Sequence, residues 1–266
     1  MTDAATDAAG ATLAPAPYRI MLSNVGYARG IDGSLRSHVR HSYRYLYCPR
    51  RVQRQAIEQL KTLIHEEDPD LCCLIEIDKG SVNSAFFNQM SVLVGPAYAW
   101  HDIENKYGST SLLRRLPVSS GKCNGFLSKR SLDYEKIYFT VGTKRLIYKI
   151  RLAPDLTVFF AHFSLRRAIR KEQFRELRRV IDETEGNVIV LGDFNIFDGH
   201  QELAPLLEKG DLELVSDPTA PTFVFSGNTM ALDLCFCSTG LAAGSNVRVR
   251  HQEFSDHFAV ILEFEA

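Results

Sequence analysis

The chain has 266 residues, of which 45% are hydrophobic and 24% charged, and its formal net charge is -1. This composition is typical of a globular protein with a sizeable core, and it excludes an overall basic field directed at nucleic acid. No run reaches the ~18 apolar residues that a membrane-spanning helix needs. An anionic partner would therefore have to be recognised by local patches of charge.

The N-terminal residues 1–17 are rich in Ala, Thr and Pro and contain neither Lys nor Arg. Because this stretch lacks a basic start and an apolar run, it does not resemble a secretory signal, and we expect a disordered tail followed by a single domain over 18–266. Most of the six cysteines lie inside apolar runs, which predicts small, buried side chains with reduced thiols. Reduced thiols favour a cytoplasmic protein.

The first predicted strand covers 18–25, and a polar, arginine-rich loop follows to about residue 49. Residues 50–67 place apolar side chains on one helical face, and the Asp-Pro pair that follows ends this helix. The later elements predicted are a strand over 70–77, a helix over 83–94, strands over 125–128, 136–141, 145–152 and 156–163, a helix over 168–184, a strand over 187–193, a short helix over 200–209, and strands over 211–215, 231–237, 246–253 and 258–264. Helices interrupt the strands without strict alternation, which predicts an α/β sandwich of packed sheets with helices outside.

Polar residues stand at the ends of several predicted strands, where an apolar run alone would not place them. An acid in such a position is costly to desolvate unless it is paired, hydrogen-bonded or near a metal. Taken singly, each of these residues has an ordinary explanation as a turn residue, a cap or a hydrogen-bonded core histidine. Together they predict one polar rim of the sandwich, formed by Asn24, Glu76, His162, Asp193, Asn195, Asp233, Asp256 and His257.

The motifs around these residues resemble the endonuclease/exonuclease/phosphatase superfamily, which includes deoxyribonuclease I, apurinic endonucleases, inositol polyphosphate 5-phosphatases and neutral sphingomyelinases. The matching motifs follow one another in order over about residues 18–264. They are LSNV at 22–25, LIEID at 74–78, NGFLS at 124–128, AH at 161–162, GDFN at 192–195, LDL at 232–234 and SDH at 255–257. The resemblance implies a four-layered α/β sandwich of the deoxyribonuclease I type, with two mixed β-sheets flanked by helices, and a catalytic domain that hydrolyses phosphoesters with the help of a metal.

A metal site follows from the same resemblance. Glu76 is the main predicted ligand, and Asn24 and Asp256 assist it directly or through water. Phosphodiesters repel a nucleophile, and a hard divalent cation with oxygen ligands neutralises their charge. The predicted cofactor is Mg²⁺, for which Mn²⁺ would substitute.

The catalytic roles implied are divided between two carboxylates, an amide and two histidines. Asp193 accepts a proton from the attacking water or orients it, and Asn195 holds Asp193 and that water. His257 donates to a phosphate oxygen as charge builds, and Asp233 orients His257 and keeps it protonated. His162 binds the phosphate from the other side.

Two departures from the superfamily pattern weaken an assignment as a nuclease. Nuclease members often have a carboxylate two residues after the first Asn, and Gly26 stands there. Their metal Glu is typically followed in the pattern Gln-Glu-x-Lys, whereas this chain has Ile75-Glu76-Ile77-Asp78. Asp78 is interpreted as a solvated turn acid, and the alternative is a second metal ligand.

The arginine-rich stretch 29–54 predicts an anionic substrate. It holds seven arginines and two histidines against one acid, with three interleaved tyrosines. A second basic stretch follows His162, and we interpret its part over 170–179 as a solvated helix face with Glu–Arg pairs. The substrate-binding residues predicted from these stretches and from the NGFLS motif are Arg29, Arg36, Asn124 and Arg166.

The sequence favours, by a small margin, hydrolysis of a phospholipid or another small phosphodiester. An endo- or exonuclease acting on DNA or RNA is the first alternative, because arginine with tyrosine also suits single-stranded nucleic acid. A catalytically silent binding module of the same fold is the second. The expected partners are an anionic phosphoester, with nucleic acid or the surface of a membrane as further candidates, and the protein is expected to be a monomer.

Overall fold

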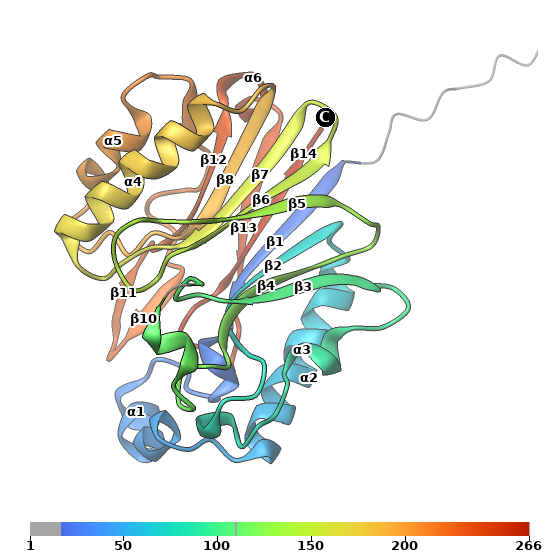
Figure 1. Ribbon diagram of the computed structural model, residues 1–266, viewed down its shortest axis with the longest axis vertical. Coiled ribbons are helices and arrows are strands. Elements are labelled where there is room, and N and C mark those ends of the chain that lie inside the picture. The colour runs from blue at the N-terminus through green and yellow to red at the C-terminus, as the bar shows by residue number, and fades with distance from the viewer. Residues whose placement is uncertain (1–16, 110, 266) are drawn as a thin grey trace, which may run out of the picture.

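The computed structural model describes residues 17–109 and 111–265, so the predicted tail, except for its last residue, lies outside the described residues. Two mixed β-sheets pack face to face between helices (Figure 1). The first sheet has the spatial order β13 (Ser245–Arg250), β14 (Ala259–Phe264), β1 (Tyr18–Asn24), β2 (Leu71–Asp78), β4 (Lys122–Ser128) and β3 (Trp100–Asn105). The second has the order β5 (Asp133–Tyr138), β6 (Leu146–Ala153), β7 (Leu156–His162), β8 (Asn187–Asp193), β12 (Asp233–Ser238) and β9 (Leu212–Leu214).

Each sheet contains one parallel pair of strands whose connection includes a long helix. Strands β1 and β2 are linked through α2 (Arg50–Glu67), and β7 and β8 are linked through α4 (Arg167–Asp182). A parallel pair needs such a crossover connection, because a tight turn can join only antiparallel strands. Since the strands of a parallel pair end at the same edge of their sheet, each pair brings its terminal polar residues to one place.

Three apolar clusters fill the spaces between the layers and confirm the predicted four-layered sandwich. The central cluster takes side chains from both sheets, such as Leu22 and Phe160. A second cluster fills the space between the first sheet and α2 with α3 (Met90–Leu93). The third lies between the second sheet and α4 with α5 (Ala204–Leu207). Burial of apolar surface on both faces of each sheet, at about 25 cal/mol per Å², is the main stabilising term.

Helix α2 agrees with its prediction from the sequence. Ala56, Leu60 and Ile64 recur every four residues and are buried in the cluster against the first sheet. The helix ends at Asp68, whose backbone is left-handed and whose N–H donates to the Ile64 carbonyl at 2.9 Å. Proline follows and cannot continue the helix.

The predicted helix over 83–94 is wrong. The structure has a 3₁₀ turn η3 (Val82–Ser84) and the short α3, and between them Ala85 and Phe86 have positive φ angles of 52° and 59°. Two successive left-handed residues cannot belong to a right-handed helix. The apolar spacing over this stretch therefore reflects two separate contacts with the core.

The sequence pattern also missed several short elements. Strand β3 is an edge strand with a mostly polar sequence, so it lacks the alternation that reveals a half-buried strand. The stretch predicted as a loop before residue 49 contains helical turns, and a small hairpin lies before β12. These elements are η1 (Gly26–Ala28), α1 (Leu35–His41), η2 (Ser42–Tyr45), β10 (Phe223–Phe225) and β11 (Asn228–Met230). The remaining short helices are η4 (Leu112–Arg115), η5 (His200–Leu203) and α6 (Thr239–Ala242).

All six cysteines are buried and free, as their apolar surroundings predict. None of the helices in residues 17–109 and 111–265 combines the length and the hydropathy that crossing a bilayer requires.

Candidate active site

The pairing of strands in the second sheet places three predicted site residues side by side. His162 at the end of β7 is opposite Asp193 at the end of β8, and Asp193 is opposite Asp233 at the start of β12. The first sheet reaches the same place through Asn24, whose Nδ2 donates to Asp193 Oδ2 at 3.1 Å. The polar rim predicted from the sequence is therefore a real cluster, and Asp193 is at its centre.

Asp193 is a buried carboxylate surrounded by groups that keep it ionised. Its Oδ2 is 3.1 Å from His162 Nε2 and 4.0 Å from His257 Nε2. Burial alone would raise the pKa of Asp193, but the two imidazoles and the Lys144 ammonium outweigh it and hold that pKa well below its ordinary value. The motif GDFN thus places a buried, negatively charged carboxylate, that of Asp193, at the end of β8.

His257 and Asp233 form a buried ion pair next to Asp193. The Nδ1 atom of His257 donates to Asp233 Oδ2 at 2.7 Å. Burial would lower the pKa of His257, but the Asp233 and Asp193 carboxylates raise it to about 10. Burial raises the pKa of Asp233 to about 6, so its carboxyl is still ionised at neutral pH. The free Nε2–H of the imidazolium points to the side where Asp193 lies.

The turn after β8 is built by a glycine and an asparagine in unusual environments. A Cβ on Gly192 would be 2.1 Å from the Ala161 carbonyl oxygen, so only glycine allows β7 and β8 to pair closely at this point. Asn195 has a positive φ of 52°, its N–H donates to Asp193 Oδ1 at 3.2 Å, and its Nδ2 donates to the Phe163 carbonyl at 3.1 Å. Asn195 therefore fixes the carboxylate of Asp193.

Glu76 lies on the opposite side of the cluster, at an irregularity in the first sheet. Its φ is 56°, and the pairing of β2 with β4 shifts register across it. Asn124 stabilises this bulge, because its Oδ1 accepts from the Glu76 N–H at 3.3 Å. Bulges re-aim a side chain out of the sheet, and here the bulge directs a carboxylate toward the rim.

Two lysines that the sequence motifs did not reveal complete the cluster. Lys106, just after β3, places its Nζ 2.8 Å from Glu76 Oε1. Burial alone would raise the pKa of Glu76, but Lys106 outweighs it, with His162 and Lys144 acting in the same direction, and holds that pKa well below its ordinary value. Lys144, in the loop between β5 and β6, contacts His162 Nε2. No local pattern marks either lysine as functional.

The charge of Lys144 influences the protonation of His162. Burial lowers the pKa of Lys144 to about 8, so its ammonium is charged at neutral pH. Burial and the Lys144 charge together lower the pKa of His162 to about 4, so this imidazole is neutral. The two histidines of the site thus carry different charges, His162 none and His257 one.

A cavity of about 130 Å³ opens beside Glu76 and is lined by Gly26, Arg29, Ile31, Tyr45, Glu76, Phe254, Ser255 and Asp256. The pKa of Asp256 is raised, first by burial and then by the negative charge of Glu76. Two carboxylates that face one cavity and repel each other are a suitable donor set for a hard divalent cation, which prefers oxygen ligands. The predicted metal ligands Glu76 and Asp256 therefore fit such an ion.

Asp193, Asp233 and His257 also lie within 4.8 Å of one another and could in principle ligate an ion. However, the 2.7 Å contact between His257 Nδ1 and Asp233 Oδ2 is a hydrogen bond, which uses one potential ligand atom of each residue. The cavity beside Glu76 is the better metal site of the two.

The comparisons with known proteins agree with this geometry. The sequence profile described as Endonuclease/Exonuclease/phosphatase family matches residues 24–257. The chain belongs to the endonuclease/exonuclease/phosphatase family. A comparison of the sequence with curated proteins gives no match. Members of this family hydrolyse phosphoesters and typically depend on a metal, and the protein is accordingly a phosphoester hydrolase.

Solved structures of the endonuclease/exonuclease/phosphatase fold superpose on nearly the whole chain. TDP2 from C. elegans has 16% sequence identity and a TM-score of 0.63, with 97% of this chain and 78% of TDP2 covered. The mannosyl-6-phosphatase Bt3783 of Bacteroides thetaiotaomicron has 14% identity and a TM-score of 0.62, with 94% and 100% covered. The endonuclease domain of TRAS1, a telomere-specific non-LTR retrotransposon, has 14% identity and a TM-score of 0.56, with 94% and 99% covered. At these identities the likeness shows the fold alone.

Lys106 bears on the chain's departure from the family pattern Gln-Glu-x-Lys. The lysine expected two residues after the predicted metal Glu is replaced by Asp78, yet Lys106, just after β3, forms an ion pair with Glu76. Asp78 is a turn acid, as predicted, but it is buried and not solvated, and its Oδ1 accepts from the N–H groups of Gly80 and Ser81. A role for Asp78 in holding the turn explains these contacts.

The predicted substrate residues lie in different surroundings. Arg29 lines the cavity, and its guanidinium stacks on the rings of Tyr27 and Tyr45. Arg36 is exposed on α1, Arg166 is exposed at the start of α4, and Asn124 is buried. The interpretation of 170–179 as a solvated face is wrong in part, because Arg170 is buried against Glu202 and Arg178 is buried against Asp211.

Proposed function

We propose that the protein is a Mg²⁺-dependent phosphodiesterase in which Asp193 and His257 act on opposite sides of the phosphorus. The observation that carries this proposal is the arrangement of charge around Asp193. The buried Asp193 carboxylate, whose pKa is lowered, has Oδ2 3.1 Å from Nε2 of His162, whose pKa is lowered, and 4.0 Å from Nε2 of His257, whose pKa is raised. Functional sites are where such strongly perturbed groups gather.

The low pKa of Asp193 favours one of its two predicted roles over the other. A carboxylate that resists protonation is a weak base, so Asp193 orients the attacking water and stabilises the positive charge that develops on it. Asn24 and Asn195 keep the carboxylate in one orientation through hydrogen bonds at 3.1 Å and 3.2 Å. Both asparagines are therefore positioning residues, and ligation of the metal by Asn24 stays a prediction.

His257 is suited to stabilise the developing charge on a phosphoryl oxygen. Its Nδ1–H is held by Asp233, so its Nε2–H is the donor that a phosphate oxygen would meet. Lys144 adds a second cation on the side of His162, where it favours the bound anion. The substrate would thus be held between two positive groups that come from different segments.

Glu76 and Asp256 would hold the ion at the cavity. Mg²⁺ bound there would neutralise the negative charge of the phosphoester. Lys106 balances the charge of Glu76 through its ion pair with Oε1. Mn²⁺ has the same preference for oxygen ligands and is expected to replace Mg²⁺.

A phospholipid or another small phosphodiester is the substrate we favour. Arg29 supplies the cavity with a cation that is rigidly stacked between two tyrosines. The missing carboxylate at Gly26 and the altered pattern after Glu76 separate the chain from the nuclease pattern. Hydrolysis of DNA or RNA is the alternative, supported by the arginine and tyrosine content of the cavity wall. A monomer in the cytoplasm agrees with the free, buried cysteines.

The experiment is a hydrolysis panel with the purified full chain in Mg²⁺, in Mn²⁺ and in EDTA. The substrates are bis-p-nitrophenyl phosphate, p-nitrophenyl phosphate, phosphatidylcholine, sphingomyelin, inositol phosphates, RNA, and single- and double-stranded DNA. We expect metal-dependent cleavage of a diester, faster for a small or lipid diester than for nucleic acid, and at least about a hundredfold slower in Asp193→Asn. A folded protein that cleaves nothing under any metal would overturn the proposal in favour of a silent binding module.

A further inference from the structure

The segment from Ser34 to Tyr47 exposes large apolar side chains at one end of the molecule, where α1 lies (Figure 1). Leu35, Val39 and Leu46 are 62%, 70% and 79% exposed, and Tyr47 is exposed beside them. We call the exposed apolar and cationic side chains of this segment together the α1 face, namely those of Leu35, Arg36, Val39, Arg40, Tyr43, Leu46 and Tyr47. Soluble proteins seldom gather so many exposed apolar groups without a partner for them.

Helix α1 carries its apolar residues on the outside. Ser37 is buried, and its hydroxyl is 3.3 Å from His41 Nδ1, so these two residues mark the face that packs on the protein. Leu35 and Val39 are four residues apart and therefore share the opposite face. A helix that packs only on its own domain has the reverse pattern.

The segment is anchored, so its exposure is not the fraying of a loop. Ser34 caps α1 by accepting from the Ser37 N–H at 3.1 Å, and the Gly33 carbonyl accepts from the Ser226 N–H at 2.8 Å. At the other end, Asn83 Nδ2 donates to the Leu46 carbonyl at 2.7 Å. A rigidly held apolar surface loses little conformational entropy when it meets a partner.

The stretch that contains the α1 face, residues 26–54, carries a strongly positive charge, although the chain as a whole does not. Residues 26–54 contain seven arginines, one aspartate and no lysine or glutamate, a formal charge of 7 - 1 = +6, which leaves -1 - 6 = -7 for the rest of the chain. Within the part of the chain that the structure describes, no carboxylate lies within 4.0 Å of any of these seven guanidinium groups, and Arg44 and Arg50 donate to backbone carbonyls.

Three arginines of α4 show the arrangement in which a guanidinium is paired with a carboxylate of the same chain. Arg170 pairs with Glu202, Arg175 with Glu172, and Arg178 with Asp211. Those three arginines form ion pairs with carboxylates of the same chain, whereas the arginines of the α1 face are available to an external anion.

The α1 face is continuous with the mouth of the cavity. Tyr45, in η2, and Arg29 line the cavity together with Glu76 and Asp256. Tyr45 is also hydrogen-bonded to His38 of α1, with 3.0 Å between its hydroxyl and His38 Nδ1. Whatever covers the α1 face therefore lies next to the groups that are proposed to cleave the phosphoester.

We propose that the α1 face docks on an anionic lipid membrane, with Leu35, Val39 and Leu46 entering the interface and the arginines contacting acidic headgroups. Apolar residues flanked by arginine are the combination that binds at the surface of an anionic bilayer. A single strand of nucleic acid would use the arginines and tyrosines but not three exposed aliphatic side chains. The docking itself does not depend on catalysis, and only its consequence, access of the site to lipid headgroups, rests on the proposed function.

Flotation with lipid vesicles in EDTA tests docking without hydrolysis. We expect the full chain to bind phosphatidylcholine vesicles that contain phosphatidylserine, and to bind pure phosphatidylcholine vesicles much more weakly. The double variants Leu35→Ser/Val39→Ser and Arg36→Glu/Arg40→Glu should each weaken binding to the anionic vesicles at least about tenfold. All four side chains are exposed, so the melting temperature should stay that of the parent protein.

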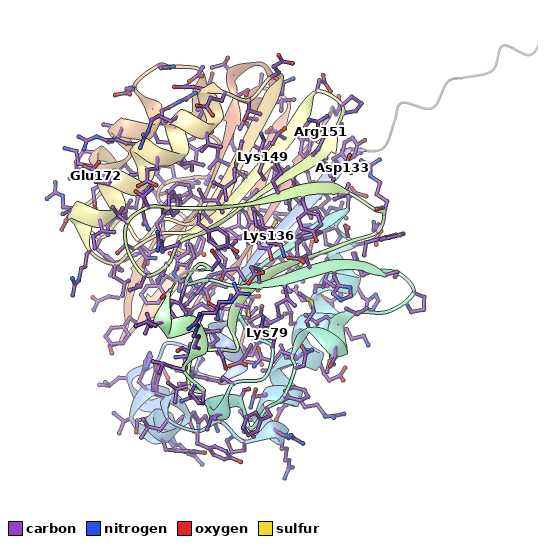
Figure 2. The ribbon with its side chains drawn as sticks, in the orientation of Figure 1. Lys79, Asp133, Lys136, Lys149, Arg151 and Glu172 are labelled. Atoms are coloured by element: carbon purple, nitrogen blue, oxygen red, sulfur yellow. The ribbon has the colours of Figure 1, made fainter. Side chains whose placement is uncertain are left out.

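Two matched controls lie elsewhere on the surface. Trp100→Ser removes an exposed apolar side chain from the first residue of β3, which is opposite Ser128 in the sheet. Arg151→Glu reverses a charge on β6, far from α1 (Figure 2). Both should bind vesicles as the parent protein does. Hydrolysis of bis-p-nitrophenyl phosphate by the parent protein tests the proposed function separately, because it needs no membrane.

Three results would overturn the proposal. The first is equal vesicle binding by the parent protein and both double variants. The second is the absence of vesicle binding together with binding of a single-stranded oligonucleotide that Arg36→Glu/Arg40→Glu abolishes, which would make the face a nucleic-acid interface. The third is the absence of vesicle binding with a dimer in size-exclusion chromatography that Leu35→Ser/Val39→Ser dissociates, which would make it a contact between two copies.

Discussion

The two sheets bring different chemistry to the edge that they share. In the second sheet, His162, Asp193 and Asp233 are neighbours in the strand ladder itself, and their relative positions follow from its register. In the first sheet, Glu76 is outside the regular ladder, at a bulge. The Asp193 side chain is 3% exposed and that of Glu76 is 20% exposed.

This difference in position and exposure suits the two sheets to two different tasks, stabilisation of a transition state and binding of a metal. A ladder of hydrogen bonds holds charged groups rigidly and away from water, which is what stabilisation of a transition state requires. A bulge places a carboxylate where solvent and an ion can reach it, which is what metal binding requires. We call the residues of the site that come from the second sheet the second-sheet half, and those that come from the first sheet the first-sheet half. We therefore expect changes in the second-sheet half to affect turnover, and changes in the first-sheet half to affect the affinity for the metal.

The largest expected effect is that of Asp193→Asn on turnover. The substitution keeps the size of the side chain and removes the charge that we propose orients the water, so kcat should fall by about 10² to 10⁴. Magnesium affinity, measured by calorimetry, should change little because the proposed ligands of the ion are Glu76 and Asp256. Asp198→Asn, an exposed acid in the following loop, is the matched control. Normal activity per folded molecule in Asp193→Asn would remove the distinction between the two halves.

Glu76→Gln tests the first-sheet half. Loss of the main ligand charge should weaken Mg²⁺ binding at least about tenfold, and part of the lost activity should return at high Mg²⁺. Asp193→Asn should show no such recovery. Glu135→Gln, on the exposed face of β5, is the control and should bind Mg²⁺ normally. If Glu76→Gln bound Mg²⁺ as tightly as the parent protein, the ion would have to be placed elsewhere.

Asp233→Asn should have a smaller effect, because it acts through His257. Without the carboxylate, the pKa of His257 should fall from about 10 toward its ordinary value, and kcat should drop by about 10 to 10². Titration of the imidazole by NMR would follow the pKa directly. Since both groups serve one transition state, Asp233→Asn should cost less in a His257→Ala background than alone. Independent losses would show that Asp233 has a separate role.

The residues of the second-sheet half could be predicted from the sequence because they are fixed by local rules. GDFN is a contiguous motif at the end of β8, and SDH is a second contiguous motif that precedes β14 of the first sheet and brings His257 to the same edge. Glu76 was found in the same way, at the end of an apolar run. The four-layered fold followed from the resemblance and is confirmed by the three apolar clusters.

Lys106 and Lys144 could not be predicted, because neither belongs to a motif or a regular pattern. Lys106 follows the edge strand β3, whose polar sequence gave no strand signal, and it reaches Glu76 from thirty positions away in the chain. Lys144 reaches His162 from a loop between two strands. Contacts of this kind depend on how the sheets pack, which a single sequence does not reveal. Similarly, the left-handed Ala85 and Phe86 break a helix that apolar spacing alone predicts.

The smallest expected effect is a dependence of substrate affinity on the protonation of Lys144, which joins the two halves through His162. Burial lowers its pKa from the ordinary 10.5 to about 8, so the side chain is a cation below pH 8 and neutral above it. A cation near the phosphate favours a bound anion, and KM should therefore rise a few-fold between about pH 7 and pH 9.

Lys144→Gln should show the high KM already at pH 7 and no further rise over this range. Lys149→Gln, on the neighbouring strand β6, should keep the rise of the parent protein, since Lys149 lies away from His162 in the ladder. The rise in KM should also shrink at high salt, because screening weakens the attraction between the charged lysine and the phosphate. A KM that is flat with pH in the parent protein would place Lys144 outside the substrate site. Its contact with His162 would then serve only to keep that imidazole neutral. The two halves would be connected by the hydrogen bond from Asn24 to Asp193, and not by a substrate bound to both.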